Sequence, residues 1–305
     1  ASFAFAQYTY VDIYDISFVD STKLANCVDS STYLGDTIVT RGIVVTDGNL
    51  SEVGSSSIVG GSRPFIALVD TSDGGSPGPF KGAVVMGADP TNNPVSDIEN
   101  ALAGDIIEIT AIVGEFNGLV QLQPLNSTAV TVVGAANIPN FITIDAGDIQ
   151  DATRSNILET GEQWDGSFVE LQNMSVTSVS IFSSGSRCEF TIQDSAGNRV
   201  LVADRFLPMV LDGVATVNPN SPQTTGKLIA PAVGTNYNHV RGVIFQDENG
   251  CAGGGSFAGG YEINPFDSTH FDQAPSPASI LSVTRNPLNP NDTQKVTVTA
   301  EIIDF

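Results

Sequence analysis

A repeated pattern constrains the fold of this chain more than any other feature of its sequence. Each copy starts with a glycine beside an aspartate, continues into a long strand-like segment, and has a second strand-like segment that ends in aspartate. The first copy comprises Gly35-Asp36 with segments 37–45 and 65–70, and the second comprises Asp165-Gly166 with segments 168–171 and 190–194. Alternation of apolar and polar residues is the period of a β-strand. The repeat therefore predicts two similar modules built mainly from strands.

The order of the predicted elements in the first copy indicates a barrel. Three strands are followed by a helix over 94–103 and then by two strands joined by a tight turn at Phe116-Asn117-Gly118. This order is typical of the OB-fold, a Greek-key barrel of five strands. The strands are expected at 37–46, 65–69, 80–86, 105–115 and 119–125, and the alternation over 8–18 predicts one further strand before them.

The second copy follows the same order with one departure. An irregular segment over 207–238 replaces the helix, and a short helix is expected within 147–159, ahead of the barrel. The strands of this copy are expected at 168–180, 188–194, 199–206, 239–246 and 260–263.

The last part of the chain differs in character. Pro275 and Pro277 mark a linker, and two strands are expected at 280–285 and 295–302. Because two strands do not form a stable domain alone, they are interpreted as the first hairpin of an immunoglobulin-like sandwich that continues beyond residue 305. The fold class is therefore mostly β, with two tandem OB-fold-like barrels and this hairpin. The expected divisions are an N-terminal segment 1–7, a first OB-like domain 8–140, a second OB-like domain 141–272, and a linker with the start of the sandwich at 273–305.

The charge of the chain is strongly acidic. It has 12 Lys and Arg against 34 Asp and Glu, which gives a formal net charge of −22 at pH 7. Such a charge repels phosphate backbones and argues against nucleic acid as a partner. Two explanations remain open, namely solubility in a salty or extracellular medium, and carboxylate sites for Ca²⁺. No stretch of apolar residues in the sequence is long enough for a membrane span.

The N-terminus and the cysteines bear on the cellular location. Residues 1–7 are interpreted as the end of a secretory signal peptide with Ala4 and Ala6 as its small-residue box, or alternatively as an ordinary apolar strand. The chain has three cysteines, Cys27, Cys188 and Cys251. A Cys188–Cys251 disulfide is predicted, because the start of strand two and the loop between strands four and five meet at one end of an OB barrel. A Cys27–Cys251 bond, or no bond, remains the alternative.

Candidate ligand and metal sites follow from the predicted barrels. OB-folds bind ligands on strands two and three and in the adjoining loops, so the candidate ligand-binding residues are Arg63, Phe182, Arg187 and Phe257. The candidate Ca²⁺ ligands are Asp70 and Asp73 in one turn, and Asp247 and Glu248 in another, with solvated turns as the alternative explanation.

No catalytic residue is assigned. The chain has two histidines, His239 and His270, and contains neither a G-x-S-x-G elbow nor an HExxH motif. The sequence is therefore interpreted as that of a protein that is not an enzyme.

Several segments together carry a resemblance to a known group of proteins. They are 4–7, the glycine–aspartate strand openings, 190–206, and the valine- and threonine-rich segments 280–287 and 296–300. With these segments the chain resembles Bacteroidetes-type secreted surface proteins, in which tandem OB-like domains precede immunoglobulin-like modules and a sorting domain for type IX secretion. The resemblance implies export to the medium or the outer cell surface. The Asp-Ser motifs also resemble the O-glycosylation pattern of such bacteria, which implies modification at Ser21, Ser195 and Ser268.

The expected function is a structural or adhesive role in a surface or extracellular assembly, through contacts with other surface proteins or with copies of the chain. Segment 8–18 is the candidate strand for donation to a neighbouring sheet. The alternative is a carbohydrate-binding module, or an accessory region of an extracellular hydrolase or nuclease.

Overall fold

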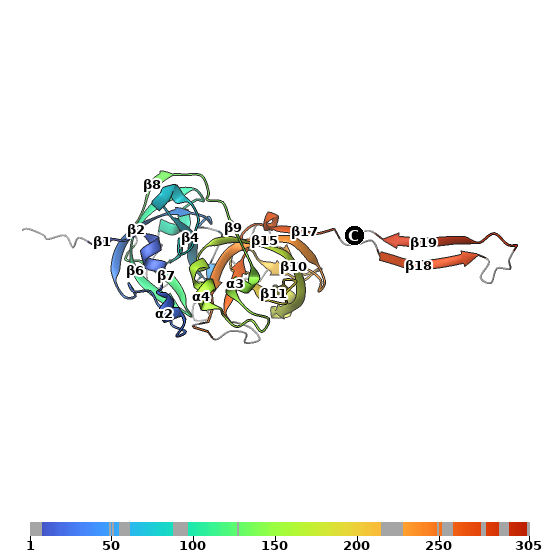
Figure 1. The fold of residues 1–305 in the computed structure, drawn as a ribbon. Helices are drawn as coiled ribbons and strands as arrows, with labels where there is room; N and C mark the ends of the chain where they lie inside the picture. Colours follow the sequence, from blue (N-terminus) through green and yellow to red (C-terminus); the bar gives the residue numbers. More distant parts are fainter. Residues whose placement is uncertain are drawn as a thin grey trace, which may run out of the picture.

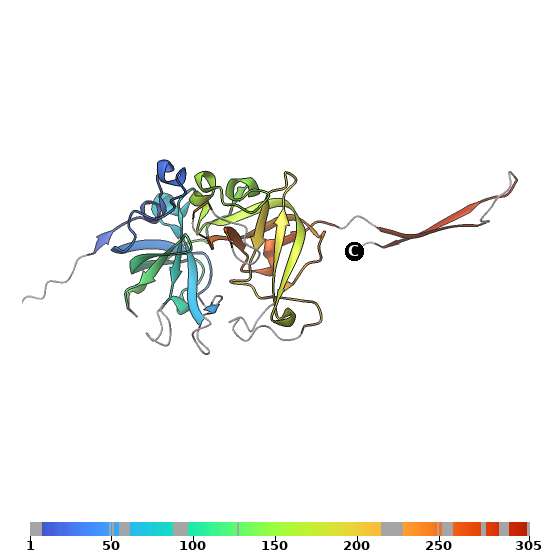
Figure 2. The same ribbon diagram turned by 90° about the horizontal axis from the view of Figure 1, so that it is seen from below.

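Strands are the main regular secondary structure of the chain and form two ring-like sheets and a separate hairpin (Figures 1 and 2). The structure, a computed structural model, describes residues 8–48, 50, 52–54, 62–87, 97–126, 128–214, 228–248, 250–251, 259–275, 279–286 and 293–303. Within this part of the chain, no helix is long and apolar enough to cross a membrane.

The first sheet closes into a five-stranded, OB-like barrel. Strand β2 pairs antiparallel with both β4 and β6, β6 pairs with β7, β4 pairs with β5, and β5 pairs in parallel with β7. The barrel strands are β2 (Thr37–Val44), β4 (Ser62–Asp70), β5 (Gly82–Met86), β6 (Asp105–Phe116) and β7 (Leu119–Pro124). Alternate residues of β6 point inward, and Ile107, Ile109, Ala111 and Val113 are all fully buried. This alternation is why the segment forms a strand with one face on the core.

The second sheet repeats these pairings. Strand β10 pairs antiparallel with both β11 and β15, β11 pairs with β12, β15 pairs with β16, and β12 pairs in parallel with β16. The ring consists of β10 (Phe168–Phe182), β11 (Arg187–Gln193), β12 (Arg199–Val202), β15 (Asn236–Gln246) and β16 (Tyr261–Asn264). A short parallel pair, β13 (Met209–Val210) with β14 (Leu228–Ile229), lies in the segment between β12 and β15.

The repeat extends beyond the ring strands. Strand β1 (Thr9–Tyr10) adds in parallel to β2, as β9 (Ile142–Ile144) adds to β10. Strand β8 (Val130–Ala135) adds antiparallel to β6, as β17 (Phe271–Gln273) adds to β15. Two short helices follow each added parallel strand: α1 (Ile13–Ser17) and α2 (Ser21–Leu24) in the first module, α3 (Ala146–Ile149) and α4 (Leu158–Gly161) in the second. The duplicated unit therefore includes its flanking strands and helices.

The remaining elements are a short strand, a hairpin and several 3-10 turns. Strand β3 (Glu52–Gly54) pairs with β4, and β18 (Ser279–Asn286) pairs with β19 (Thr297–Ile303) as a hairpin that extends away from the barrels in both views (Figures 1 and 2). The 3-10 turns are η1 (Ser72–Gly75), η2 (Asp97–Asn100), η3 (Glu162–Trp164), η4 (Ser183–Gly185) and η5 (Ser268–His270).

Among the described residues, three apolar clusters form the core of the molecule. One fills the first barrel, with Ile38, Leu68 and Ile107 among its members, and one fills the second ring, with Phe190 and Tyr261. The third cluster lies between the two modules and contains residues of both. Its first-module members are Val45, Phe65, Ala67, Val69, Val84, Met86 and Leu119, and its second-module members are Phe168, Phe206, Val243 and Phe245.

Two expectations about local structure are wrong. The segment 8–18 is not one strand, because only Thr9–Tyr10 is extended and α1 follows. Ile13 and Ile16 stand three residues apart and are both fully buried, so the segment covers the core with a helical face rather than a strand face. The predicted helix over 94–103 is reduced to the 3-10 turn Asp97–Asn100, and residues 94–96 lie outside the described part.

The predicted Cys188–Cys251 disulfide is also wrong. The bond joins Cys27 to Cys251, across 224 residues, and it links the loop after α2 of the first module to the loop after β15 of the second. Cys188 is a free, fully buried thiol on β11. It belongs to the apolar core of the second ring, which explains why it does not reach the β15–β16 loop.

Candidate functional site

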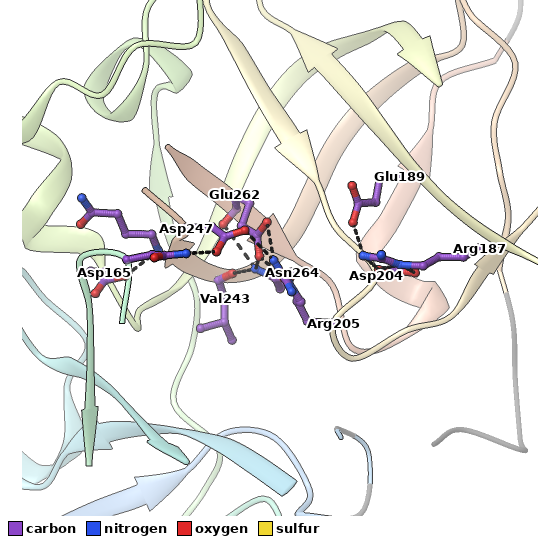
Figure 3. A network of polar contacts seen from close by, with 11 residues as sticks. Asp165, Arg187, Glu189, Asp204, Arg205, Val243, Asp247, Glu262 and Asn264 are labelled. Atoms are coloured by element: carbon purple, nitrogen blue, oxygen red, sulfur yellow. Dashed lines mark hydrogen bonds and ion pairs between the residues drawn. The ribbon is translucent and has the colours of Figure 1, made fainter. Parts of the chain in front are cut away.

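Charged side chains gather on the second ring around β11, β12 and β16, where the sequence predicted a ligand face (Figure 3). Arg187 and Glu189 lie two residues apart on β11, and Glu262 lies on β16. Asp204 and Arg205 lie just beyond the end of β12, and Asp247 follows β15. We call these six residues the arginine–carboxylate network.

Arg205 binds two carboxylates. Its Nε donates to Glu262 Oε1 at 2.9 Å and one terminal nitrogen donates to Asp247 Oδ2 at 2.8 Å. The Glu262 side chain is only 3% exposed, against 26% for Arg205. The charge of Glu262 raises the pKa of Arg205, since the cation is stabilised by its buried partner.

Arg187 forms the second half of the network. Its Nε donates to Asp204 Oδ2 at 2.9 Å and a terminal nitrogen donates to Asp204 Oδ1 at 2.9 Å, which is the bidentate geometry of a strong pair. The same guanidinium also donates to Glu189 Oε1. Burial raises the pKa of Glu189 to about 7, although Arg187 acts in the opposite direction.

This arrangement has a clear chemical consequence. Both guanidinium groups of the network already hold carboxylates in paired geometry, so an anionic ligand would have to displace Asp204 or Asp247. Arg154, whose terminal nitrogen donates to Gly259 O at 3.2 Å, lies close enough to Glu262 and Glu189 to interact with their charges. The face is therefore built to hold the ring together, and its positive charge is compensated from within.

The network continues into the contact between the two modules. Asn117 Nδ2, in the β6–β7 turn of the first module, donates to Asp247 Oδ1 at 3.0 Å. Gly118 forms an isolated antiparallel bridge with Asp247. Gly82 of β5 lies so close to Gly166 that a Cβ on Gly82 would come within 2.3 Å of the Gly166 carbonyl carbon. The modules thus meet with backbone against backbone, which requires glycine at these positions.

Buried carboxyl groups lie at the same junction. Asp29 Oδ2 accepts hydrogen bonds from Gln246 Nε2 at 2.7 Å and from the Gly250 amide at 2.6 Å. Asp165 Oδ1 accepts a hydrogen bond from the backbone amide of Gln246, and the Tyr261 hydroxyl donates to Glu162 Oε2 at 2.9 Å. Burial raises the pKa of Asp165 to about 8 and raises the pKa of Glu162 well above its usual range. Burial at the junction therefore favours the protonated form of Asp165 and Glu162 in the folded chain.

The predicted ligand-binding residues are only partly brought together. Phe182 lies under the Arg187 guanidinium, 5.1 Å from the ring centroid, so these two residues form a cation–π pair. Phe257 and the Arg63 side chain lie outside the described residues.

The predicted Ca²⁺ ligands do not form a site. Asp70 is fully buried and accepts from the Tyr14 and Ser72 amides, while Asp73 pairs with Lys81 at 2.9 Å. Asp247 pairs with Arg205, and Glu248 offers its backbone carbonyl to Gln246 and Asn156. Within the described ranges, no three His, Cys, Asp or Glu side chains are grouped so that they could hold a metal ion. The acidic turns are thus used as internal caps and ion pairs.

The predicted O-glycosylation sites share one local structure. Ser21, Ser195 and Ser268 are all exposed, and in each case the preceding aspartate accepts a hydrogen bond from the amide two residues further along. Modification at these serines stays a prediction.

Sequence reasoning missed two features. The junction carboxyl groups of Asp29, Glu162 and Asp165 carry no local signal, because they come from distant parts of the chain. A group of rings formed by the exposed Tyr14 and Phe18 and the half-buried Phe80 was also missed. The four-residue spacing of Tyr14 and Phe18 was a usable signal of a helix face, but it was interpreted as part of a strand.

Comparison with known proteins places the chain in no family. No family model matches the sequence, and no curated protein matches it. One solved structure to which the chain is similar is described as an aspartyl-tRNA synthetase from Leishmania major Friedlin. The identity is 14% and the TM-score is 0.23, and the match covers 51% of this chain and 25% of that one. At that TM-score the likeness supports no conclusion about function.

Proposed function

We propose that this chain is a non-enzymatic structural and interaction region of an exported protein, at the cell surface or in an extracellular assembly. In this proposal both rings are OB-fold-like barrels that act as one rigid unit. The identical order of strand pairings in the two rings, including the parallel pairs β5–β7 and β12–β16, supports the OB-fold interpretation.

The observation that carries the proposal is the apolar cluster shared by the two modules. The ring centroid of Phe65, on β4, lies 4.5 Å from that of Phe206 and 5.3 Å from that of Phe245. Both of these partners belong to the second module. All three side chains are at most 4% exposed. Modules that share a core do not swing freely, in contrast to modules on a flexible linker. Such a unit suits a spacer or a platform for other proteins.

Two further observations support the setting and the mode of action. A disulfide across the junction is typical of proteins that fold in an oxidising compartment. The arginine–carboxylate network compensates its own charge, as expected for a structural face rather than a phosphate-binding one.

The hairpin β18–β19 is proposed as the start of an immunoglobulin-like sandwich. Val283 and Val298 are 61% and 64% exposed, and a hairpin of this kind has marginal stability without further strands. Amide exchange at β18 and β19 should slow down when the chain is extended with more of its natural sequence. Unchanged exchange would contradict the sandwich.

Electron microscopy and mass measurement on the protein recovered from its native source test the proposed function. A larger assembly that contains the chain, located outside the cell, is the expected result. A cytosolic protein, or hydrolytic activity carried by residues 1–305 themselves, would overturn the proposal.

A further inference from the structure

An exposed aromatic cluster lies on the first module. Tyr14 and Phe18 are both 39% exposed and stand one turn apart, with ring centroids at 5.8 Å. Phe80 completes the cluster, with its centroid 5.3 Å from Phe18 and 6.2 Å from Tyr14. Contacts between aromatic rings normally bury them in a core, whereas Tyr14 and Phe18 remain exposed and Phe80 is only half-buried. Exposed groups of this kind mark interaction sites more often than scattered apolar residues do.

The backbone holds each ring in place. The Tyr14 amide donates to the buried Asp70 carboxylate at 2.7 Å, and Ser17 Oγ, within the same helix, donates to Gly82 O at 2.8 Å. The Phe80 amide donates to Gln163 O of the second module at 2.7 Å. Phe80 also has a φ of 59°, a left-handed conformation that is unfavourable for an aromatic residue. Such conformations persist only where the surroundings impose them, and they cluster at functional sites.

The charges around the cluster favour a cationic partner. The two segments that carry the rings, 8–18 and 70–82, contain four aspartates and one lysine: Asp12, Asp15, Asp70, Asp73 and Lys81. Lys81 is neutralised by Asp73, at 2.9 Å. The faces of aromatic rings attract ammonium and guanidinium groups, and nearby carboxylates add to this attraction. The formal net charge of −22 also attracts basic partners over longer distances.

We propose that the aromatic cluster Tyr14–Phe18–Phe80 is a docking site for a basic segment of a partner protein, with an arginine or lysine side chain placed over the rings. This gives the proposed interaction role a specific surface and a kind of partner. The binding test below can fail while the proposed function stands, because it measures this surface alone.

The test uses the whole chain and a short arginine-rich peptide labelled for fluorescence anisotropy. The matched probe is the same peptide with citrulline in place of arginine, which keeps the shape and removes the charge. The arginine peptide should bind, and the citrulline peptide should bind much more weakly. Tyr14→Ala and Phe18→Ala should each weaken binding of the arginine peptide about fivefold, the size expected for loss of an exposed cation–π contact.

Four further variants separate this site from general effects. Phe116→Ala removes a ring that is 61% exposed on β6 and should leave binding unchanged. Asp15→Asn should weaken binding more than Asp212→Asn, an exposed aspartate of the second module. Phe18→Leu keeps apolar bulk and lacks the ring face, so it should bind as weakly as Phe18→Ala. Thermal unfolding of each variant identifies any that fail to fold.

Four outcomes would overturn the proposal. They are equal binding of both peptides, equal losses in Phe18→Ala and Phe116→Ala, glycan binding that depends on Tyr14 without peptide binding, and self-association in sedimentation that Phe18→Ala abolishes. The last two would assign the surface to a sugar or to a second copy of the chain.

Discussion

Arg205 and Glu262 show what a single charged residue does when its partner is buried. The carboxylate of Glu262 has almost no access to water, and the guanidinium of Arg205 supplies the compensating charge and a hydrogen bond. Arg41 and Glu108 form a pair of similar length, 2.7 Å, but their side chains are 48% and 37% exposed. Water already solvates the exposed pair, so the two pairs should differ greatly in their contribution to stability.

Replacing Arg205 should therefore destabilise the chain far more than replacing Arg41. Arg205→Ala leaves Glu262 buried without its cation and should lower the free energy of unfolding by about 3 kcal/mol. Arg41→Ala should lower it by less than about 1 kcal/mol. Urea unfolding of both variants measures the difference, and equal losses would show that the network is solvated in solution.

Asp165 is a second residue whose environment decides its chemistry. An aspartate in an unfolded chain has a pKa of about 4, whereas burial at the junction raises the pKa of Asp165 to about 8. The folded chain thus binds a proton that the unfolded chain has released. The stability contributed by this group is complete below about pH 4 and is lost as the pH rises towards 8.

The variant Asp165→Asn mimics the protonated carboxyl. Wild-type protein should be less stable at pH 8 than at pH 5 by roughly a few kcal/mol, and this difference should shrink in Asp165→Asn. Asp36→Asn, at an exposed position, is the control and should follow the wild-type curve. If the free energy of unfolding falls equally with pH in the wild type and in Asp165→Asn, the raised pKa of Asp165 is contradicted.

At the scale of elements, short turns determine how the rings close and how they meet. The turn between β6 and β7 has positive φ at Asn117 and Gly118, the geometry of a two-residue hairpin. The turn between β11 and β12 uses Gly197 at a φ of 98°. The two turns differ in their surroundings. A Cβ added at Gly118 would lie against the Gln246 side chain of the other module. A Cβ added at Gly197 would have only the end of the Gln193 side chain near it, at 4.0 Å.

This difference predicts unequal effects of the same substitution. Gly118→Ala places a Cβ 2.4 Å from the Gln246 side chain in addition to the cost of positive φ, whereas Gly197→Ala carries the backbone cost alone. We expect Gly197→Ala to cost about 1 kcal/mol and Gly118→Ala to cost about 1–3 kcal/mol more. Denaturant unfolding of the pair checks this, and equal costs would mean that Gln246 moves aside freely.

At the scale of the whole molecule, contacts between distant parts of the chain make one body of two modules. The Cys27–Cys251 bond closes a loop of 224 residues beside the shared apolar cluster and the junction carboxyl groups. A cross-link of this length restricts the unfolded chain strongly, although its measured contribution varies among proteins.

The double variant Cys27→Ser/Cys251→Ser should lose about 2–5 kcal/mol of stability. Alkylation of the unfolded, unreduced wild-type chain should label one cysteine, Cys188, as identified by mass spectrometry of its peptides. The variant Cys188→Ala should take up no label under the same conditions. Labelling of Cys27 or Cys251 in the wild type would contradict the disulfide.

Local signals account for what the sequence predicted correctly. Alternation and turn residues located all ten ring strands to within a few residues, and they located the hairpin at the end of the chain. They failed where tertiary contacts override local preference. Segment 8–18 alternates well enough to suggest a strand, yet burial of Ile13 and Ile16 against the barrel selects a helix. The sequence singled out Arg187 on this charged face, but it did not predict that nearby carboxylates neutralise Arg187 and Arg205.

The sequence by itself determined a mostly β chain with a duplicated unit, because strand periodicity and turn chemistry are properties of neighbouring residues. Only the tertiary structure decided which cysteines pair, which carboxyl groups are buried, and which aromatic rings remain exposed. Each of these depends on residues that approach only after the barrels close. Cys27 meets Cys251, and Asp29 meets Gln246, across more than two hundred positions of the chain, and no local pattern encodes an approach over that distance.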